Sequence, residues 1–116
     1  MRYEYLFVYG TLMSKFNNRY SKFLRKYSKF IGPGYIKGEI FQISWYPGVK
    51  KSLYFKNRVK GELYLIKNPK KVFKILDKYE DASKFNLKNY EYKREKYCVN
   101  INRKIVNSWV YFYKNS

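Results

Sequence analysis

Short runs of β-branched and aromatic residues recur along this 116-residue chain, and most of them are followed within two residues by glycine or asparagine. Such runs are typical of short β-strands joined by turns. They cover residues 5–9, 35–43, 53–55, 59–66, 92–101 and 105–113. The length allows one domain, over residues 1–116, with a core of its own. The pattern therefore predicts a single α+β domain built on a mostly antiparallel sheet.

Two stretches between these runs have the spacing of short amphipathic helices. The first, residues 19–27, carries four apolar residues on one face: Tyr20, Phe23, Leu24 and Tyr27. Asn17 or Asn18 is expected to cap it. The second is expected to begin at Asn68–Pro69, with the asparagine as N-cap, and to end at Glu80–Asp81. Its buried face is expected to hold Val72, Phe73, Leu76 and Tyr79.

Two segments rich in glycine and proline are expected to be turns. Phe30–Gly34 contains Gly-Pro-Gly and is predicted to reset the chain before the strand at 35–43. Trp45–Val49 has Pro47 and Gly48 at the central positions of a reverse turn. Many short strands and two short helices favour a small closed β-barrel, because closure leaves no exposed strand edge. An open twisted sheet is the alternative.

The formal charge of +18 is the most unusual property of the composition. A basic surface attracts phosphates, so a nucleic-acid-binding protein is one interpretation. However, Lys, Asn, Tyr, Phe and Ile are abundant together, as AT-rich coding DNA produces in any protein. The lysines are also scattered, with adjacent pairs only at 50–51 and 70–71. We therefore expect a general solvated basic surface rather than a dedicated phosphate-binding track.

Several classes of site are excluded by what the sequence lacks. With no histidine, it has neither the usual general base nor the commonest zinc ligand. The single cysteine, Cys98, allows no internal disulfide, fits a reducing compartment, and is expected to be a buried small residue in a strand. No apolar stretch approaches the ~20 residues of a membrane span, and no signal peptide is apparent. We expect a cytoplasmic protein, monomeric or weakly dimeric, without metal or cofactor.

The segment Phe7–Leu12 is the first candidate for a functional site. A buried strand runs directly into Gly10, where the backbone can approach a ligand closely. The main-chain N–H groups of Gly10, Thr11 and Leu12 can then converge into a donor surface for a carboxylate or an oxyanion. An ordinary turn after the strand is the alternative. Tyr9 is expected either to line the pocket or to be a core aromatic residue.

Acidic residues are few, with eight Asp and Glu in the chain, so each carboxylate is a candidate acid or base. Asp77 and Glu80 lie three residues apart near the C-terminus of the second helix, where the helix macrodipole disfavours negative charge. A position unfavourable for stability indicates a functional reason for the charge. The alternative is a solvated pair offset by Lys74 and Lys78.

Taken together and in order, six short motifs resemble the gamma-glutamyl cyclotransferase superfamily, and most closely its small branch, which includes gamma-glutamylamine cyclotransferases. The motifs are Phe7–Leu12, Gly38, Tyr46–Gly48, Gly61–Tyr64, Leu76-Asp77-x-x-Glu80 and Tyr92-x-Arg94. They span nearly the whole chain. One departure is Asp81, which stands where the family usually has glycine after the catalytic glutamate.

The resemblance implies a closed β-barrel with flanking helices and a cavity at one end. It implies Glu80 as the catalytic residue, and substrate binding by Tyr9, Gly10, Thr11 and Leu12. Asp77, Tyr92 and Arg94 are implied as supporting residues, with Arg94 expected to bind Asp77 or to fix the Glu80 loop. The implied reaction converts a gamma-glutamyl amide to 5-oxoproline and a free amine, as an acyl transfer or lyase step, without metal or cofactor.

The residues present are compatible with this chemistry. The α-amine of the substrate attacks its own γ-carbonyl, so the nucleophile comes from the substrate and the enzyme supplies positioning. One carboxylate can serve as the acid and the base, since a desolvated carboxyl exchanges its proton near neutral pH. Two alternatives remain: a non-catalytic barrel that binds a small carboxylate or metabolite, and a basic nucleic-acid-binding protein.

Overall fold

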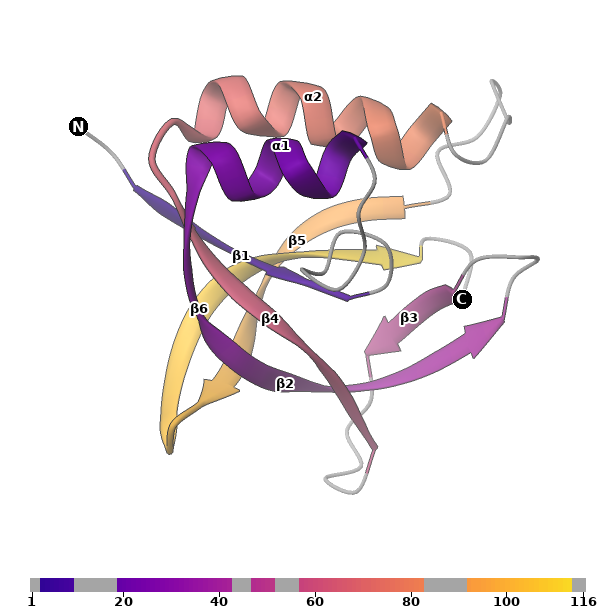
Figure 1. Ribbon diagram of the computed structural model, residues 1–116. Coiled ribbons are helices and arrows are strands. Elements are labelled where there is room, and N and C mark those ends of the chain that lie inside the picture. The colour runs from indigo at the N-terminus through magenta and orange to yellow at the C-terminus, as the bar shows by residue number, and fades with distance from the viewer. Residues whose placement is uncertain (1–2, 10–18, 43–46, 52–56, 83–91, 114–116) are drawn as a thin grey trace.

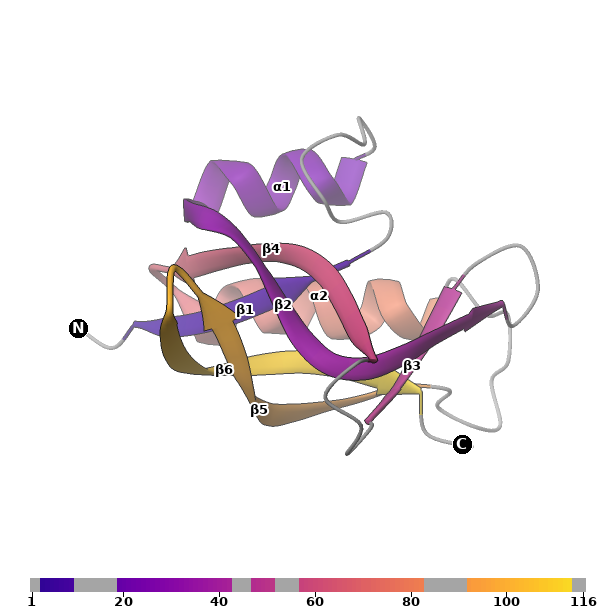
Figure 2. The same cartoon turned by 90° about the horizontal axis from the view of Figure 1, so that it is seen from below.

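Five strands close into a ring in the computed structural model of the chain (Figures 1 and 2). The order around the ring is β2 (Ser28–Gln42), β4 (Arg58–Ile66), β1 (Glu4–Val8), β6 (Lys104–Tyr113) and β5 (Tyr92–Ile101). Pairing of Tyr35 with Asn100 joins β5 back to β2. A sixth strand, β3 (Pro47–Lys51), pairs with β2. All pairs are antiparallel except β1 with β6, so the α+β class and the closed, mostly antiparallel sheet are confirmed.

The structure describes residues 3–9, 19–42, 47–51, 57–82 and 92–113. Within these ranges, only the backbone is described for residues 40–42, 47, 48, 50, 78–82, 92, 93 and 113. The expected caps Asn17 and Asn18 and the expected strand at 53–55 therefore lie outside the described residues.

Two helices lie side by side against the outside of the ring (Figure 1). Helix α1 covers Arg19–Tyr27, with the predicted bounds, and α2 covers Pro69–Ala82. As predicted, α2 begins at Pro69, and the Val72 N–H donates to the Asn68 carbonyl at 3.0 Å. It ends one residue beyond the predicted Asp81. The helices run in opposite directions, so the end of α1 meets the start of α2.

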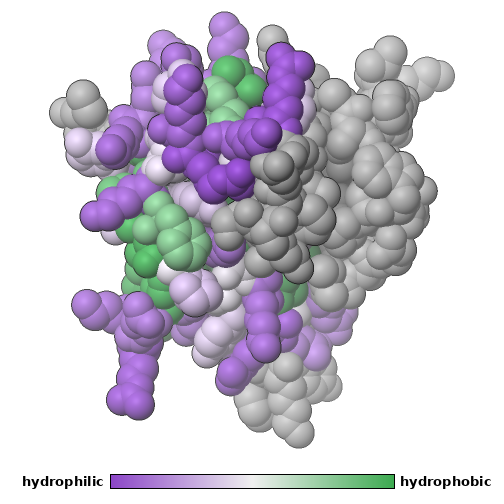
Figure 3. Space-filling view, viewed as in Figure 1, coloured by the Kyte–Doolittle hydropathy of each residue, from purple (hydrophilic) through white to green (hydrophobic). Residues whose placement is uncertain are grey.

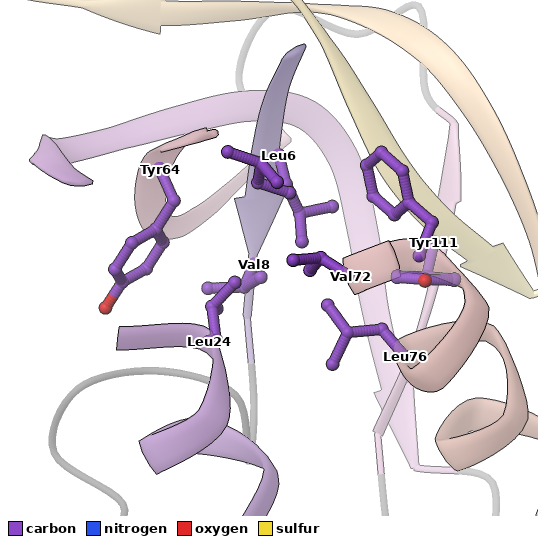
Figure 4. Packing of buried hydrophobic residues seen from close by; sticks show 9 residues of the cluster. Leu6, Val8, Leu24, Tyr64, Val72, Leu76 and Tyr111 are labelled. Carbon is purple, nitrogen blue, oxygen red and sulfur yellow. The ribbon is translucent and has the colours of Figure 1, made fainter. Parts of the chain in front are cut away.

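Alternation along the strands divides the buried side chains between two clusters. Residues on one face fill the inside of the ring: Phe7, Ile36, Val49, Val59, Leu63, Val99, Ile101, Val110 and Phe112. Residues on the other face pack beneath the helices (Figure 4): Leu6, Val8, Leu24, Tyr64, Ile66, Val72, Phe73, Leu76 and Tyr111. The inward residues predicted for α2 are confirmed where their side chains are described, which excludes Tyr79. Strands β1, β4 and β6 therefore present one face to the helices and the other to the ring interior, whereas the buried hydrophobic residues of β2, β3 and β5 belong to the interior cluster.

The turn predicted at Phe30–Gly34 is wrong, because β2 continues through it for 15 residues. A register shift against β4 between Phe30 and Gly32 takes up the irregularity as a bulge. Gly32 has a φ of 156°, which residues with a Cβ rarely adopt. Pairing with β4 thus overrides the local turn signal. Pro47 and Gly48 likewise begin β3 instead of forming the centre of a turn.

The position of Cys98 also differs from the prediction, because its side chain is exposed. Val99, its neighbour in β5, points into the ring, so Cys98 points outward by strand alternation. Among the residues that the structure describes, no helix is long and apolar enough to cross a membrane.

Candidate active site

Tyr9 joins the end of β1 to β6. The residue is half-buried and packs against the cluster inside the ring. Its hydroxyl donates a hydrogen bond to the main-chain carbonyl of Tyr111. Gly10, Thr11 and Leu12, which were predicted to bind substrate, lie outside the described residues. The hydrogen bond nevertheless holds Tyr9, the residue immediately before that segment, against β6.

Asp77 is bound by side chains from two strands. Its Oδ1 accepts a hydrogen bond from Arg94 Nε at 3.0 Å, and its Oδ2 accepts one from Arg94 Nη2 at 3.3 Å. The Tyr111 hydroxyl donates to Oδ1 at 2.6 Å. The expected Arg94–Asp77 pair is therefore present, and a bidentate guanidinium compensates for a carboxylate near a helix C-terminus. The Asp77 side chain is 44% exposed, so water screens the charges and the pair mainly fixes geometry.

These contacts form one connected network, which we call the Asp77 network: Tyr9, Asp77, Arg94 and Tyr111. It links the end of β1, helix α2 and the β5–β6 hairpin. Glu80 lies in α2 three residues after Asp77, so its backbone is ~4.5 Å further along the helix axis. Tyr92 begins β5 and pairs with Tyr113. The side chains of Glu80 and Tyr92 are outside the described part of the structure.

A groove of about 430 Å³ runs beside α2 and ends at this network. Phe73 and Trp109 line it, in an edge-to-face contact with centroids 6.1 Å apart. The Arg94 guanidinium carbon lies 3.9 Å from the Phe73 ring centroid and 4.4 Å from that of Trp109. Stacking on two rings and pairing with Asp77 together leave Arg94 little freedom, which makes it a rigid support for the helix.

A second carboxylate is buried on the same face of the sheet, closer to α1. Glu62 accepts a hydrogen bond from the Tyr64 hydroxyl at 3.1 Å. Burial raises the pKa of Tyr64 above its ordinary value of 10.0, and the Glu62 charge and hydrogen bond raise it further. Glu62 pairs across the sheet with Val8. It was not among the predicted site residues, and its hydrogen bond with Tyr64 lies within one strand.

Sequence reasoning missed Tyr111, although a signal for it was present. Asn102 and Arg103 form the two-residue turn between β5 and β6, with φ values of 48° and 63°. This turn sets the hairpin register, which places Tyr111 directly opposite Arg94. Counting outward from the turn would have identified the pair. Among the described residues, no group of three or more His, Cys, Asp or Glu side chains could hold a metal ion.

Comparisons with solved structures show the same fold. An AIG2-like protein from Mus musculus matches with a TM-score of 0.74 at 20% identity, over 100% of this chain and 80% of the mouse chain. YkqA from Bacillus subtilis matches with a TM-score of 0.74 at 23% identity, over 97% of this chain and 36% of YkqA. PH0828 from Pyrococcus horikoshii gives 0.66 at 18% identity, covering 97% and 80% of the two chains.

This chain therefore spans little more than a third of YkqA and most of the other two proteins. At such identities the similarity establishes the fold alone. A search of curated proteins finds no match. A sequence profile described as gamma-glutamyl cyclotransferase, AIG2-like, matches residues 6–116. Because this match covers nearly the whole chain, the protein belongs to the gamma-glutamyl cyclotransferase, AIG2-like family.

Proposed function

We propose that the protein is an enzyme that cyclises a gamma-glutamyl amide to 5-oxoproline and releases a free amine. Glu80 is the general acid and base in this proposal. The segment Gly10–Leu12 contributes main-chain donors to the substrate, and Tyr9 positions that segment. Family membership supports the reaction class. The geometry of the Asp77 network is the single observation that carries the assignment of the site.

The network supports the proposal because its ends adjoin the two segments that the reaction needs. At one end, Tyr9 bonds to the Tyr111 carbonyl immediately before Gly10. At the other end, the Tyr111 hydroxyl bonds to Asp77, one helical turn before Glu80. One residue, Tyr111, thus touches both sides of the proposed site through different atoms. An intramolecular cyclisation depends on positioning above all, so such a support is what the reaction requires.

The proposed reaction is balanced without an added reagent. Glu80 takes a proton from the substrate α-ammonium, and the freed amine nitrogen attacks the γ-carbonyl carbon to form the ring bond. The carbonyl oxygen becomes an oxyanion, which main-chain N–H groups after Tyr9 stabilise. When the oxyanion collapses, the bond from the γ-carbon to the amide nitrogen breaks. Glu80 returns the proton to that nitrogen, and the amine leaves. The ring nitrogen then gives its second proton to the Glu80 carboxylate, which passes it to the departing amine, so the product is neutral at the lactam nitrogen.

Replacing Glu80 tests the proposal directly. Glu80→Gln keeps the size of the side chain and removes its proton exchange, so release of 5-oxoproline from gamma-glutamyl amides should fall by at least ~100-fold. Glu39→Gln is the matched control, because Glu39 is an exposed carboxylate bonded to Asn57 at 2.8 Å, away from the network. Turnover by Glu80→Gln at the parent rate would overturn the role of Glu80. Binding of these compounds by the parent protein without turnover would contradict the proposed enzymatic activity and favour a metabolite-binding barrel.

A second variant tests the role of Asp81, which stands where the family usually has glycine. Asp81 is the penultimate residue of α2, directly after Glu80. A second carboxylate beside the proposed base would hold protons in competition with it. Asp81→Gly, which restores the family's usual residue, should shift the pH–rate profile while leaving the product unchanged. An identical profile in both proteins would show that Asp81 plays no part in the proton transfer.

A further inference from the structure

Four exposed lysines meet where α1 ends and α2 begins. We call them the junction patch: Lys26, Lys67, Lys70 and Lys71. The main-chain N–H of Lys67 lies 3.5 Å from the carbonyl oxygen of Tyr27, to which it donates. The Nζ atoms of Lys71 and Lys26 lie 4.6 and 5.5 Å from the centroid of the Tyr27 ring. The fold thus brings Lys71 to the same aromatic ring as Lys26, the sequence neighbour of Tyr27.

The junction patch has no acidic counterpart among the described residues. Helix α1 contains no acidic residue at all. The described carboxylates are engaged elsewhere: Glu4 with Lys96, Glu39 with Asn57, Glu62 with Tyr64, Asp77 with Arg94, and Glu95 with Lys51. Figure 3 shows hydrophilic side chains projecting from the side of the molecule that the helices form. Within the described part of the chain, no carboxylate is paired with a lysine of the junction patch.

Two of these lysines occupy positions that oppose the stability of the fold. Lys70 and Lys71 lie in the first turn of α2, and that turn has no acidic residue. The helix macrodipole is positive at this end, so it repels both side chains. Selection for stability alone would favour Asp or Glu there. An anion bound at the junction would interact favourably with the dipole and with both lysines.

The residues around the patch favour a nucleic acid over a membrane surface as the partner. A helix that binds in the plane of a membrane needs an exposed apolar face. Here the apolar residues Leu24, Val72 and Leu76 are all fully buried against the sheet. Proteins that bind single strands combine a row of cations with an aromatic ring, and Tyr27 is half-buried among the lysines. We propose that the junction patch binds the phosphate backbone of single-stranded nucleic acid without reading its sequence.

The experiment compares two triple variants that remove the same charge. The patch variant carries Lys26→Gln, Lys70→Gln and Lys71→Gln. The control carries Lys37→Gln, Lys60→Gln and Lys104→Gln, which replace one exposed lysine on each of β2, β4 and β6. Binding of a fluorescent oligouridylate of about 16 nucleotides is followed by anisotropy at several salt concentrations around 0.15 M.

Loss of three phosphate contacts should reduce the slope of log K against log salt by roughly 2 and weaken binding at ~0.15 M salt by roughly fiftyfold. The control should lose less than about threefold, since its lysines contribute only to the general field. The melting temperature of the patch variant should not fall, because two of its changes relieve repulsion by the helix dipole. Weak binding by this variant would then not be a result of unfolding.

Three results would overturn the proposal. Equal losses in both triple variants would assign any binding to net charge instead of the junction patch. Absence of binding by the parent protein at ~0.15 M salt would rule out single-stranded nucleic acid as the partner. Retention on phosphatidylserine vesicles without oligonucleotide binding would identify a membrane surface instead. The test is separate from the proposed enzyme because its readout is oligonucleotide binding and not turnover; of the six lysines, only Lys70 lines the groove beside α2.

Discussion

The regions beneath the two helices each contain a tyrosine bonded to a carboxylate, in very different settings. Toward α1, Tyr64 donates to Glu62, and both residues belong to β4, two positions apart. Beneath α2, Tyr111 donates to Asp77, and the bond joins a strand to a helix. The first pair is buried, whereas the second is partly exposed and is shared with Arg94. The same chemical pair therefore has different consequences.

A bond within one strand stabilises the strand and its burial but does not fix one element relative to another. The Tyr64–Glu62 bond contributes to satisfying a buried carboxylate. The Tyr111–Asp77 bond is weakened by solvent, yet it holds α2 against the β5–β6 hairpin. We infer that the α1 side contributes more to stability and the α2 side more to the geometry of the proposed site. Three predictions test this difference.

The largest effect on stability is expected for Tyr64→Phe. The change removes one hydrogen bond from a buried carboxylate, so the free energy of unfolding should fall by about 2 kcal/mol. Any release of 5-oxoproline should be unaffected. Chemical denaturation at neutral pH measures the loss. Tyr97→Phe is the matched control, because the Tyr97 hydroxyl bonds to the Lys37 carbonyl at an exposed position and its removal should matter little. A cost equal to that of the control would contradict the stated role of the α1 side.

A somewhat smaller effect is expected from alkaline pH. In the folded protein Tyr64 keeps its proton above its ordinary pKa of 10.0, whereas in the unfolded chain it loses the proton near that value. The folded state therefore binds more protons than the unfolded chain above pH 10. The contribution of Tyr64 to the free energy of unfolding is fully present below this pH and is lost as the pH rises. Tyr64 contributes a slope of up to about 1.4 kcal/mol per pH unit. Urea denaturation on both sides of pH 10 should show a shallower decline for Tyr64→Phe. Parallel declines would contradict the assignment to Tyr64.

How much of this could be predicted from the sequence depends on whether each signal was local. The bounds of α1 were predicted because the spacing of Tyr20, Phe23, Leu24 and Tyr27 needs no information from the rest of the chain. The course of β2 through Gly32 and Pro33 was not, since the local signal favours a turn and only pairing with β4 extends the strand. The outward position of Cys98 was missed because a short apolar run does not reveal its buried face.

The same distinction applies to the candidate site. Asp77 and Arg94 were identified through motifs, and their contact is present. Their part in a reaction remains a prediction, as do the roles of Glu80, Tyr92 and Gly10–Leu12. Tyr111 carries no motif of its own, and it matters because its hydroxyl and its carbonyl face different partners. Such a residue can be identified from the register of the two strands, which the hairpin turn determines. Motifs carry no information about this register.

The smallest change in stability, and the sharpest test of the comparison, is expected for Tyr111→Phe. Asp77 keeps both bonds from Arg94, so the free energy of unfolding should fall by only about 1 kcal/mol, less than for Tyr64→Phe. If the Asp77 network positions Glu80, however, kcat for 5-oxoproline release should fall about tenfold with little change in KM, since the loss acts on orientation during the chemical step. Each tyrosine variant is the control for the other. A fall in kcat for Tyr64→Phe but not for Tyr111→Phe would contradict this comparison. The buried Glu62 carboxylate beneath α1 would then matter more to the reaction than the contact between α2 and the β5–β6 hairpin.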